Sequence, residues 1–99
     1  MNAKPLTVIA QLNAKPGKES LVRQELRSLV APSRKDAGCL SYDLHQAPDN
    51  PALFLFLESW TSKAHLDQHL QKPDLQAVLA RVGQLVAEPP RITLWEKIS

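Results

Sequence analysis

The chain has 99 residues, of which 43% are hydrophobic and 22% are charged, with a formal net charge of +2. A chain of this length forms a single domain, residues 1–99, around one hydrophobic core. Its lysines and arginines form no basic stripe, which excludes nucleic acid as the expected partner.

The single cysteine, Cys39, excludes an intrachain disulfide and a cysteine-rich metal site. The first apolar run, residues 6–12, is too short for a signal peptide or for a membrane span, which needs about twenty apolar residues. We therefore expect a cytoplasmic protein without a membrane span.

Hydrophobic periodicity divides the first part of the chain into a strand and a helix. Residues 6–12 are rich in β-branched side chains and predict a strand. Apolar residues at three- and four-residue spacing over 21–30 predict an amphipathic helix. Pro32 predicts a kink or a loosened last turn of that helix, and Gly38 predicts its left-handed cap.

Residues 39–46 and 53–60 predict two strands of a hairpin, joined by a turn of about five residues. Ser62 is the predicted N-cap of a helix that runs to about Lys72. Pro73 ends that helix. Asp74 is predicted to cap the next helix, residues 75–86, whose apolar residues recur along that range. Residues 91–98 predict the last strand.

This order of elements predicts an α+β fold of the ferredoxin-like βαββαβ type, with a four-stranded antiparallel sheet and the helices on one face. The strand 53–60 is apolar on both faces, because Leu53, Leu55 and Leu57 alternate with Phe54, Phe56 and Trp60. A sheet that is apolar on both faces needs a second cover, and a second copy of the chain provides one. We therefore expect a homodimer.

Glu58 is expected between two aromatic side chains on one face of its strand, so burial would raise its pKa. It is either a proton acceptor in an apolar pocket or a structural carboxylate paired with a cation or the backbone, and the sequence leaves both open.

His65 and His69 have the four-residue spacing of two metal ligands on a helix, but position 66 is Leu where the metalloprotease motif has its Glu. We therefore expect no metal. His69 lies beside the apolar stripe of Leu66 and Leu70. It is therefore either a proton shuttle in a pocket or a residue at the edge of the core whose hydrogen bonds are satisfied. His65 lies further round the helix and is expected to be solvated.

Several of these residues recur in one spaced pattern: Gly38-Cys39-x-x-Tyr42, then Glu58-x-Trp60-x-Ser62-x-x-x-Leu66-x-x-His69, then Pro73. This pattern resembles the antibiotic biosynthesis monooxygenase (ABM) domain. The segments LTVIAQLNAKPGKE and AHLDQHLQKPDLQA are similar to small bacterial quinol monooxygenases of that family.

The resemblance implies a dimeric α+β barrel with a pocket between sheet and helices in each protomer. It also implies oxidation of a quinol or similar electron-rich aromatic by O2, without flavin, haem or metal, so that no cofactor is expected. In such chemistry the protein supplies an apolar pocket, a base and partners for an oxyanion. By position, the expected catalytic residues are His69 and Glu58, and the expected substrate-binding residues are Trp60, Tyr42, Phe56 and Leu66.

The chain departs from two branches of the family. Phe56 stands where polyketide-oxidising relatives carry an Asn. Ala10 and Leu79 stand near the positions of an Asn and a His in haem-degrading relatives, so haem ligation is not expected. Two alternatives to the oxygenase stay open, a non-catalytic dimer that binds or senses a hydrophobic small molecule and a muconolactone-type isomerase.

Overall fold

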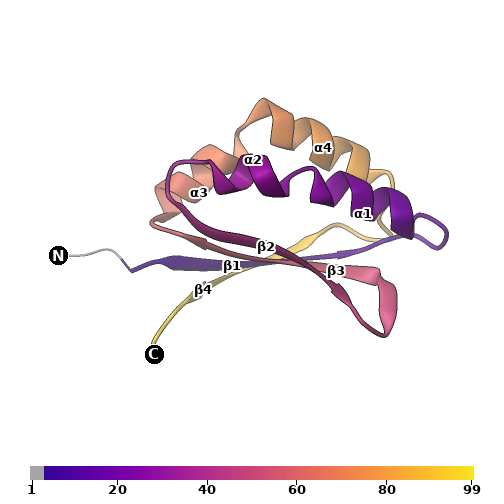
Figure 1. Ribbon diagram of the computed structural model, residues 1–99, viewed down its shortest axis with the longest axis horizontal. Helices are drawn as coiled ribbons and strands as arrows, with labels where there is room; N and C mark the ends of the chain where they lie inside the picture. The colour runs from indigo at the N-terminus through magenta and orange to yellow at the C-terminus, as the bar shows by residue number, and fades with distance from the viewer. Residues whose placement is uncertain (1–3) are drawn as a thin grey trace.

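The computed structural model describes residues 4–99. Four strands and four helices follow one another in the order β1, α1, α2, β2, β3, α3, α4, β4 (Figure 1). The strands are β1 (Leu6–Asn13), β2 (Cys39–Ala47), β3 (Asn50–Trp60) and β4 (Arg91–Glu96). The helices are α1 (Glu19–Arg27), α2 (Val30–Arg34), α3 (Lys63–Leu70) and α4 (Pro73–Gly83).

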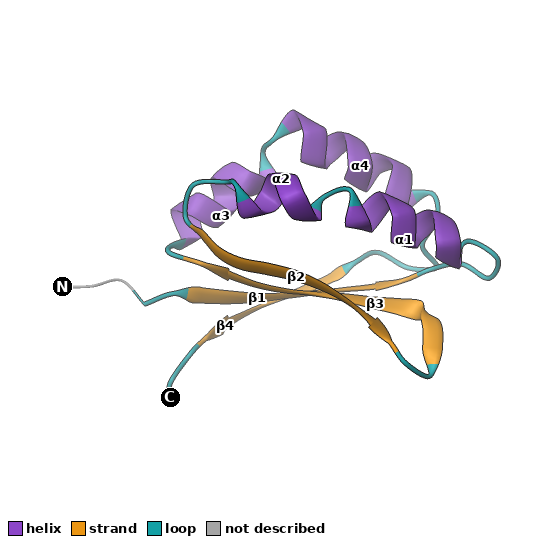
Figure 2. Cartoon of the chain, viewed as in Figure 1, coloured by secondary structure: helices purple, strands orange, loops and turns teal. Residues whose placement is uncertain are grey.

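The four strands form one antiparallel sheet in the order β2-β3-β1-β4. Strands β1 and β2 are thus parallel but separated by β3, which is the split arrangement of a ferredoxin-like fold. All four helices cover the same face of the sheet, and its other face carries none of them (Figure 2). The predicted fold class, element order and one-sided helix layer are confirmed.

The register of the sheet decides which side chains share a row on the helix side. Tyr42 of β2 is paired with Glu58 of β3, which is paired with Val8 of β1. In the next row, Phe56 of β3 is paired with Ala10 of β1. Because alternate residues of a strand point to one face, all five side chains point towards the helices.

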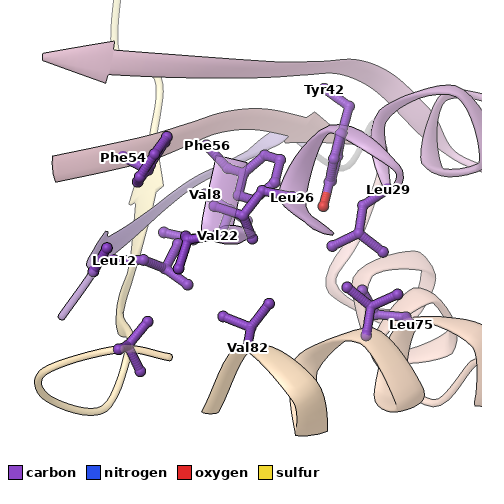
Figure 3. Packing of buried hydrophobic residues seen from close by; sticks show 14 of the residues in the cluster. Val8, Leu12, Val22, Leu26, Leu29, Tyr42, Phe54, Phe56, Leu75 and Val82 are labelled. Atoms are coloured by element: carbon purple, nitrogen blue, oxygen red, sulfur yellow. The ribbon is translucent and has the colours of Figure 1, made fainter. Parts of the chain in front are cut away.

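The hydrophobic core fills the space between the sheet and the helices. The side chains of Val8, Phe54 and Trp60 come from the sheet, and those of Val22 and Leu26 come from α1; each is at most 2% exposed. Figure 3 shows the apolar side chains of the two layers facing one another. This burial holds the helix layer on the sheet, since each such side chain contributes about 1.5–3 kcal/mol when removed from water.

The first helical segment is broken shortly before Pro32, where a kink or a loosened last turn was expected. α1 ends at Arg27 and α2 begins at Val30, so Pro32 itself lies inside α2. A proline has no N–H to donate to the carbonyl of the residue four positions earlier, which is Ser28. Ser28 lies in the break between α1 and α2. In the same break, the amide of Leu29 donates to the carbonyl of Leu26, three positions back, at 3.1 Å.

Two predicted helix caps are wrong. Gly38 has the expected positive φ of 80°, but α2 has already ended with Lys35 as its C-cap. Lys72, not Asp74, is the N-cap of α4, because Pro73 takes the first helical position and places Asp74 within the first turn. The predicted cap of α3 is confirmed, since the Ser62 hydroxyl accepts a hydrogen bond from the amide of His65 at 3.2 Å.

The predicted ends of the elements differ from the observed ones by a few residues. The hairpin turn is shorter than predicted, because β2 runs on to Ala47 and β3 already begins at Asn50. The last helix ends at Gly83, and Val86 instead forms a β-bridge with Ala14. The last strand ends at Glu96 rather than at residue 98.

Candidate functional site

A pocket of about 290 Å³ lies between the sheet and the helices. Its sheet side is formed by residues of all four strands: Ala10, Leu12, Tyr42, Phe56, Glu58 and Ile92. Its helix side includes residues from α3 and α4 and from the junction of α1 and α2: Leu29, His69, Leu70, Leu75, Leu79 and Gly83. The wall is therefore mostly apolar, with three side chains that can exchange or donate a proton.

Two larger hollows, of about 430 and 470 Å³, lie elsewhere on the surface. The titratable side chains that line them are exposed, as for Arg27 and His45 in one hollow and Glu88 in the other. The pocket between the layers instead combines apolar walls with the buried side chains of Glu58 and His69.

Glu58 is a buried carboxylate on the sheet side of the pocket, with a residue exposure of 5%. Its Oε1 accepts a hydrogen bond from Nε1 of Trp60 at 2.9 Å. Burial raises the pKa of Glu58 to about 6, and the bond from Trp60 opposes that rise. Glu58 can therefore gain or lose a proton close to neutral pH. Its partner is an indole, and not the cation that the structural alternative assumed.

His69 lies on α3, on the helix side of the pocket, opposite the sheet that carries Glu58. It is 3% exposed. Its Nδ1 lies 2.7 Å from Oδ2 of Asp36. Its ring packs on Trp60 and Tyr42, with centroid distances of 4.6 and 5.5 Å. Burial lowers the pKa of His69, and Asp36 opposes this by stabilising the charged ring. The imidazole is therefore neutral at pH 7 and able to accept a proton.

Asp36 is the site residue that the sequence did not indicate. It lies in the turn between α2 and β2, with a side chain that is 13% exposed, and its Oδ1 accepts a hydrogen bond from Nζ of Lys72. Burial raises the pKa of Asp36, but the hydrogen bonds and charges of Lys72 and His69 outweigh burial and hold the pKa below its ordinary value. An aspartate in a turn is ordinary turn chemistry, and 33 residues separate it from His69, so no sequence spacing could have found this pair.

Tyr42 is the third polar group of the pocket wall. Its residue exposure is 2%, and its ring centroid lies 4.9 Å from that of Phe56. Figure 3 shows its hydroxyl directed from β2 towards the helix layer, near Leu29. Burial, with help from the charge of Glu58, raises the pKa of Tyr42. The phenol therefore stays protonated at neutral pH and can donate a hydrogen bond.

The structure brings four of the six expected site residues together in the pocket wall: His69, Glu58, Tyr42 and Phe56. Trp60 and Leu66 are buried, at 0% and 3% exposure, but within the described chain they lie behind the wall and not on it. Trp60 contacts both Glu58 and His69: its Nε1 donates a hydrogen bond to Glu58, and its ring packs against that of His69.

His65 lies outside the pocket wall. It is half-buried and not fully solvated as expected, since its Nδ1 lies 2.9 Å from Thr61 Oγ1 and 2.8 Å from Ser62 Oγ. Within residues 4–99, three or more His, Cys, Asp or Glu side chains nowhere gather closely enough to hold a metal ion. Over the same residues, every helix is too short or too polar to cross a lipid bilayer.

The solved structures that resemble this fold include two bacterial proteins. Protein PA3566 from Pseudomonas aeruginosa superimposes with a TM-score of 0.91 at 35% identity, covering 100% of this chain and 99% of that one. Rv0793 from Mycobacterium tuberculosis superimposes with a TM-score of 0.90 at 30% identity, covering 96% of each chain.

Sequence relatives carry monooxygenase names. Over 90 residues the chain is 36% identical to the M. tuberculosis protein named "Putative monooxygenase Rv0793", covering 91% of this chain and 88% of that protein. It is 32% identical to the Escherichia coli protein named "Probable quinol monooxygenase YgiN", covering 73% of this chain and 79% of that protein. The family model described as antibiotic biosynthesis monooxygenase matches residues 5–81. The chain therefore belongs to the antibiotic biosynthesis monooxygenase family.

Proposed function

We propose that the protein is a cofactor-independent monooxygenase that oxidises a quinol or a similar electron-rich aromatic with O2. The observation that carries the proposal is the apolar pocket of about 290 Å³ in which His69 and Glu58 are buried. The monooxygenase names of the relatives, one of them a quinol monooxygenase, point to the same chemistry.

The pocket suits a compact aromatic ligand. Its volume is at the lower end of the range of roughly 300–1,000 Å³ that small-molecule pockets occupy. The rings of Tyr42 and Phe56 and the side chains of Leu75 and Leu79 offer flat and apolar surface to such a ligand. A hydroxyl on the ligand then finds its polar partners in the three side chains that can exchange or donate a proton.

The first chemical step is removal of a proton from that hydroxyl. His69 is neutral at pH 7 and acts as the base, and Glu58, with a pKa of about 6, is the second candidate base. Tyr42 remains protonated and donates a hydrogen bond to the oxyanion that forms. A deprotonated quinol is rich enough in electrons to reduce O2 by itself.

The overall reaction balances without another reductant. A quinol and O2 give a hydroxyquinone and water: one oxygen atom forms the new C–O bond and the other leaves as water. The substrate supplies all four electrons that reduce O2. The two hydrogens of the water come from the substrate as well, one of them through the base.

The test is oxygen uptake by the purified protein with a panel of reduced naphthoquinols and anthrones, in the presence of a metal chelator. We expect uptake above the rate of autoxidation. His69→Ala should reduce kcat by about 10²–10⁴-fold, which is the usual contribution of a general base. His65→Gln is the matched control on the same helix and should keep the wild-type rate, because His65 lies outside the pocket wall.

Two results would contradict the proposal. Tight binding of these aromatics without oxygen uptake would indicate a binding or sensing protein. Turnover of an unsaturated lactone in the absence of O2 would indicate an isomerase.

We also propose that the protein forms a homodimer through the open face of the sheet. Alternate residues of β3 place Leu53, Leu55 and Leu57 on that face, and Ile9 of β1 and Trp95 of β4 extend the apolar surface across its neighbours. Leu57 and Trp95 are 40% and 55% exposed in the single chain. A second sheet packed face to face would cover them.

A further inference from the structure

We propose that Asp36 is a positioning residue, which fixes the ring of His69 in the tautomer that leaves Nε2 free to accept a proton in the pocket. The inference deepens the proposed function and rests on it for its role in turnover. The tautomer itself can be measured without any substrate.

The turn that carries Asp36 is held from both sides. The amide of Asp36 donates to the carbonyl of Ser33 at 3.0 Å, and its carbonyl accepts from the amide of Cys39 at 3.1 Å. The carboxylate is mostly buried and has both oxygens occupied, Oδ2 by His69 and Oδ1 by Lys72. Its position is therefore set by the backbone and by two side-chain partners, and it cannot rotate without losing one of them.

An ionised carboxylate can only accept hydrogen bonds. Asp36 is ionised at neutral pH because its two donors hold its pKa low. The contact of 2.7 Å therefore requires the proton to be on Nδ1 of His69. A neutral imidazole with a proton on Nδ1 has its lone pair on Nε2.

Nε2 is the nitrogen that remains available. Among residues 4–99, every side-chain nitrogen or oxygen that is fully buried has a hydrogen-bond partner. Nδ1 is the ring atom of His69 that the described contacts engage, so Nε2 keeps accessible surface. Because Nδ1 faces Asp36 and the ring lines the pocket, Nε2 is the atom that can meet a ligand there.

Lys72 gives the carboxylate a second function. Its ammonium group partly neutralises Asp36, so that Asp36 orients the ring of His69 while raising its pKa less than a lone carboxylate would. The other ionisable groups that face the ring are Glu58, across the pocket, and Tyr42, whose ring it contacts edge-on. Tyr42 is neutral, and the charge state of His69 depends on its burial and on the charges of Asp36 and Lys72.

The decisive variant is Asp36→Asn, because Lys72 controls how the new amide turns. The ammonium group of Lys72 can only donate, so it selects the amide oxygen and leaves the amide NH2 facing His69. The NH2 would then donate to Nδ1, and the proton of the ring would move to Nε2. Nε2 would no longer be a base.

The first measurement is the tautomer of His69 by ¹⁵N–¹H NMR of the ring nitrogens at pH 7, without substrate. We expect a protonated Nδ1 in the wild type and a protonated Nε2 in Asp36→Asn. In the double variant with Lys72→Met the amide is free to turn back, and a protonated Nδ1 should return at least in part. Asp67→Asn, in an Asp–Lys pair on the exposed side of the same helix, is the control and should change nothing.

The second measurement is turnover on any substrate that the oxygen-uptake panel identifies. Asp36→Asn should lower kcat by about 10²–10⁴-fold with little change in KM, since the carboxylate does not line the pocket. Lys72→Met should retain activity but move the acid limb of the pH profile upwards, because removing the ammonium raises the pKa of His69. If Asp36 and Lys72 had only structural roles, Asp36→Asn would not lower kcat selectively, and Lys72→Met would not shift the pH profile while activity is retained.

A wild-type spectrum with the proton on Nε2 overturns the inference, and this result needs no variant to fold. An Asp36→Asn protein that is folded and retains both the Nδ1 proton and the wild-type kcat overturns it as well. If the tautomers are as expected and no substrate of the panel is oxidised, the proposed function fails and the role of Asp36 in fixing the ring stands.

Discussion

Glu58 is a carboxylate whose burial makes folding depend on pH. Its pKa rises from an ordinary 4.5 to about 6 on folding, because the pocket removes it from water. The group therefore favours the folded state most when it is protonated, below pH 4.5. That contribution is lost as the pH rises through about 6.

The difference between the two pKa values corresponds to about 2 kcal/mol of unfolding free energy. Glu58→Gln removes the charge and keeps an oxygen that can accept the hydrogen bond from Trp60. We therefore expect the variant to gain about 2 kcal/mol over the wild type between pH 4 and pH 8, measured by urea unfolding at each pH. Glu88→Gln, at an exposed carboxylate, is the control and should show no such pH-dependent gain. If the unfolding free energies of the Glu58→Gln variant and the wild type changed in parallel with pH, Glu58 would be well solvated.

At the scale of elements, one turn connects the helix layer to both halves of the site. Gly38, between α2 and β2, accepts a hydrogen bond from the amide of Thr61 just before α3, at 2.8 Å. A Cβ built at Gly38 would lie 2.3 Å from Cγ of His65. The same turn carries Asp36, so the approach of α3 to this turn also sets the distance between Asp36 and His69.

Gly38→Ala should therefore destabilise the protein in two ways, through the positive φ of 80° and through the clash with His65. Gly17→Ala is the matched control, since Gly17 has a φ of 82° and no atom near its Cβ position. We expect the control to lose about 1–2 kcal/mol from backbone strain and Gly38→Ala to lose more. Urea unfolding measures both, and equal losses would mean that His65 moves aside without cost.

The sequence predicted the strands and their faces because both depend on local periodicity. It assigned Glu58, Phe56 and Trp60 to one face of β3, and all three lie on the helix side. Period two gives the face of a side chain but not its depth beneath the next layer. Trp60 was therefore expected in the pocket wall, whereas it lies behind His69.

The features that the sequence did not predict depend on contacts between distant segments. The pairing of Asp36 with His69 and Lys72 joins the turn before β2 to the end of α3 and the start of α4. The pocket similarly combines Ala10 with Ile92, which meet only because β1 pairs with β4. Hydrophobic pattern and cap chemistry carry no information on such pairings.

At the scale of the whole molecule, the two faces of the sheet differ in what covers them. The helices cover one side (Figure 1), and the open side carries the apolar residues of the proposed dimer interface. A monomer of 11.0 kDa would leave that surface in water. The association state in solution is therefore the measurement that tests this part of the proposal.

We expect light scattering after size exclusion to give twice the mass of one chain at micromolar concentration. Leu57→Arg should shift that mass to a monomer, because a buried guanidinium without a partner is costly at an apolar interface. Leu21→Arg is the control, since Leu21 is 49% exposed on α1, away from the open face, and the mass should not change. A monomeric wild type would remove the argument for two packed sheets.

The position of β1 in the sheet has a consequence for the order of folding. β1 is the first strand of the sequence but an inner strand of the sheet, and its outer partner is β4, so that Leu6 is paired with Glu96. Pairings across nearly the whole sequence slow folding, since a long loop must close before it gains any contact. During synthesis on the ribosome, the edge of β1 that pairs with β4 stays unpaired until β4 has been made. The pocket, which needs Ile92 in its wall, is therefore among the last parts of the protein to become complete.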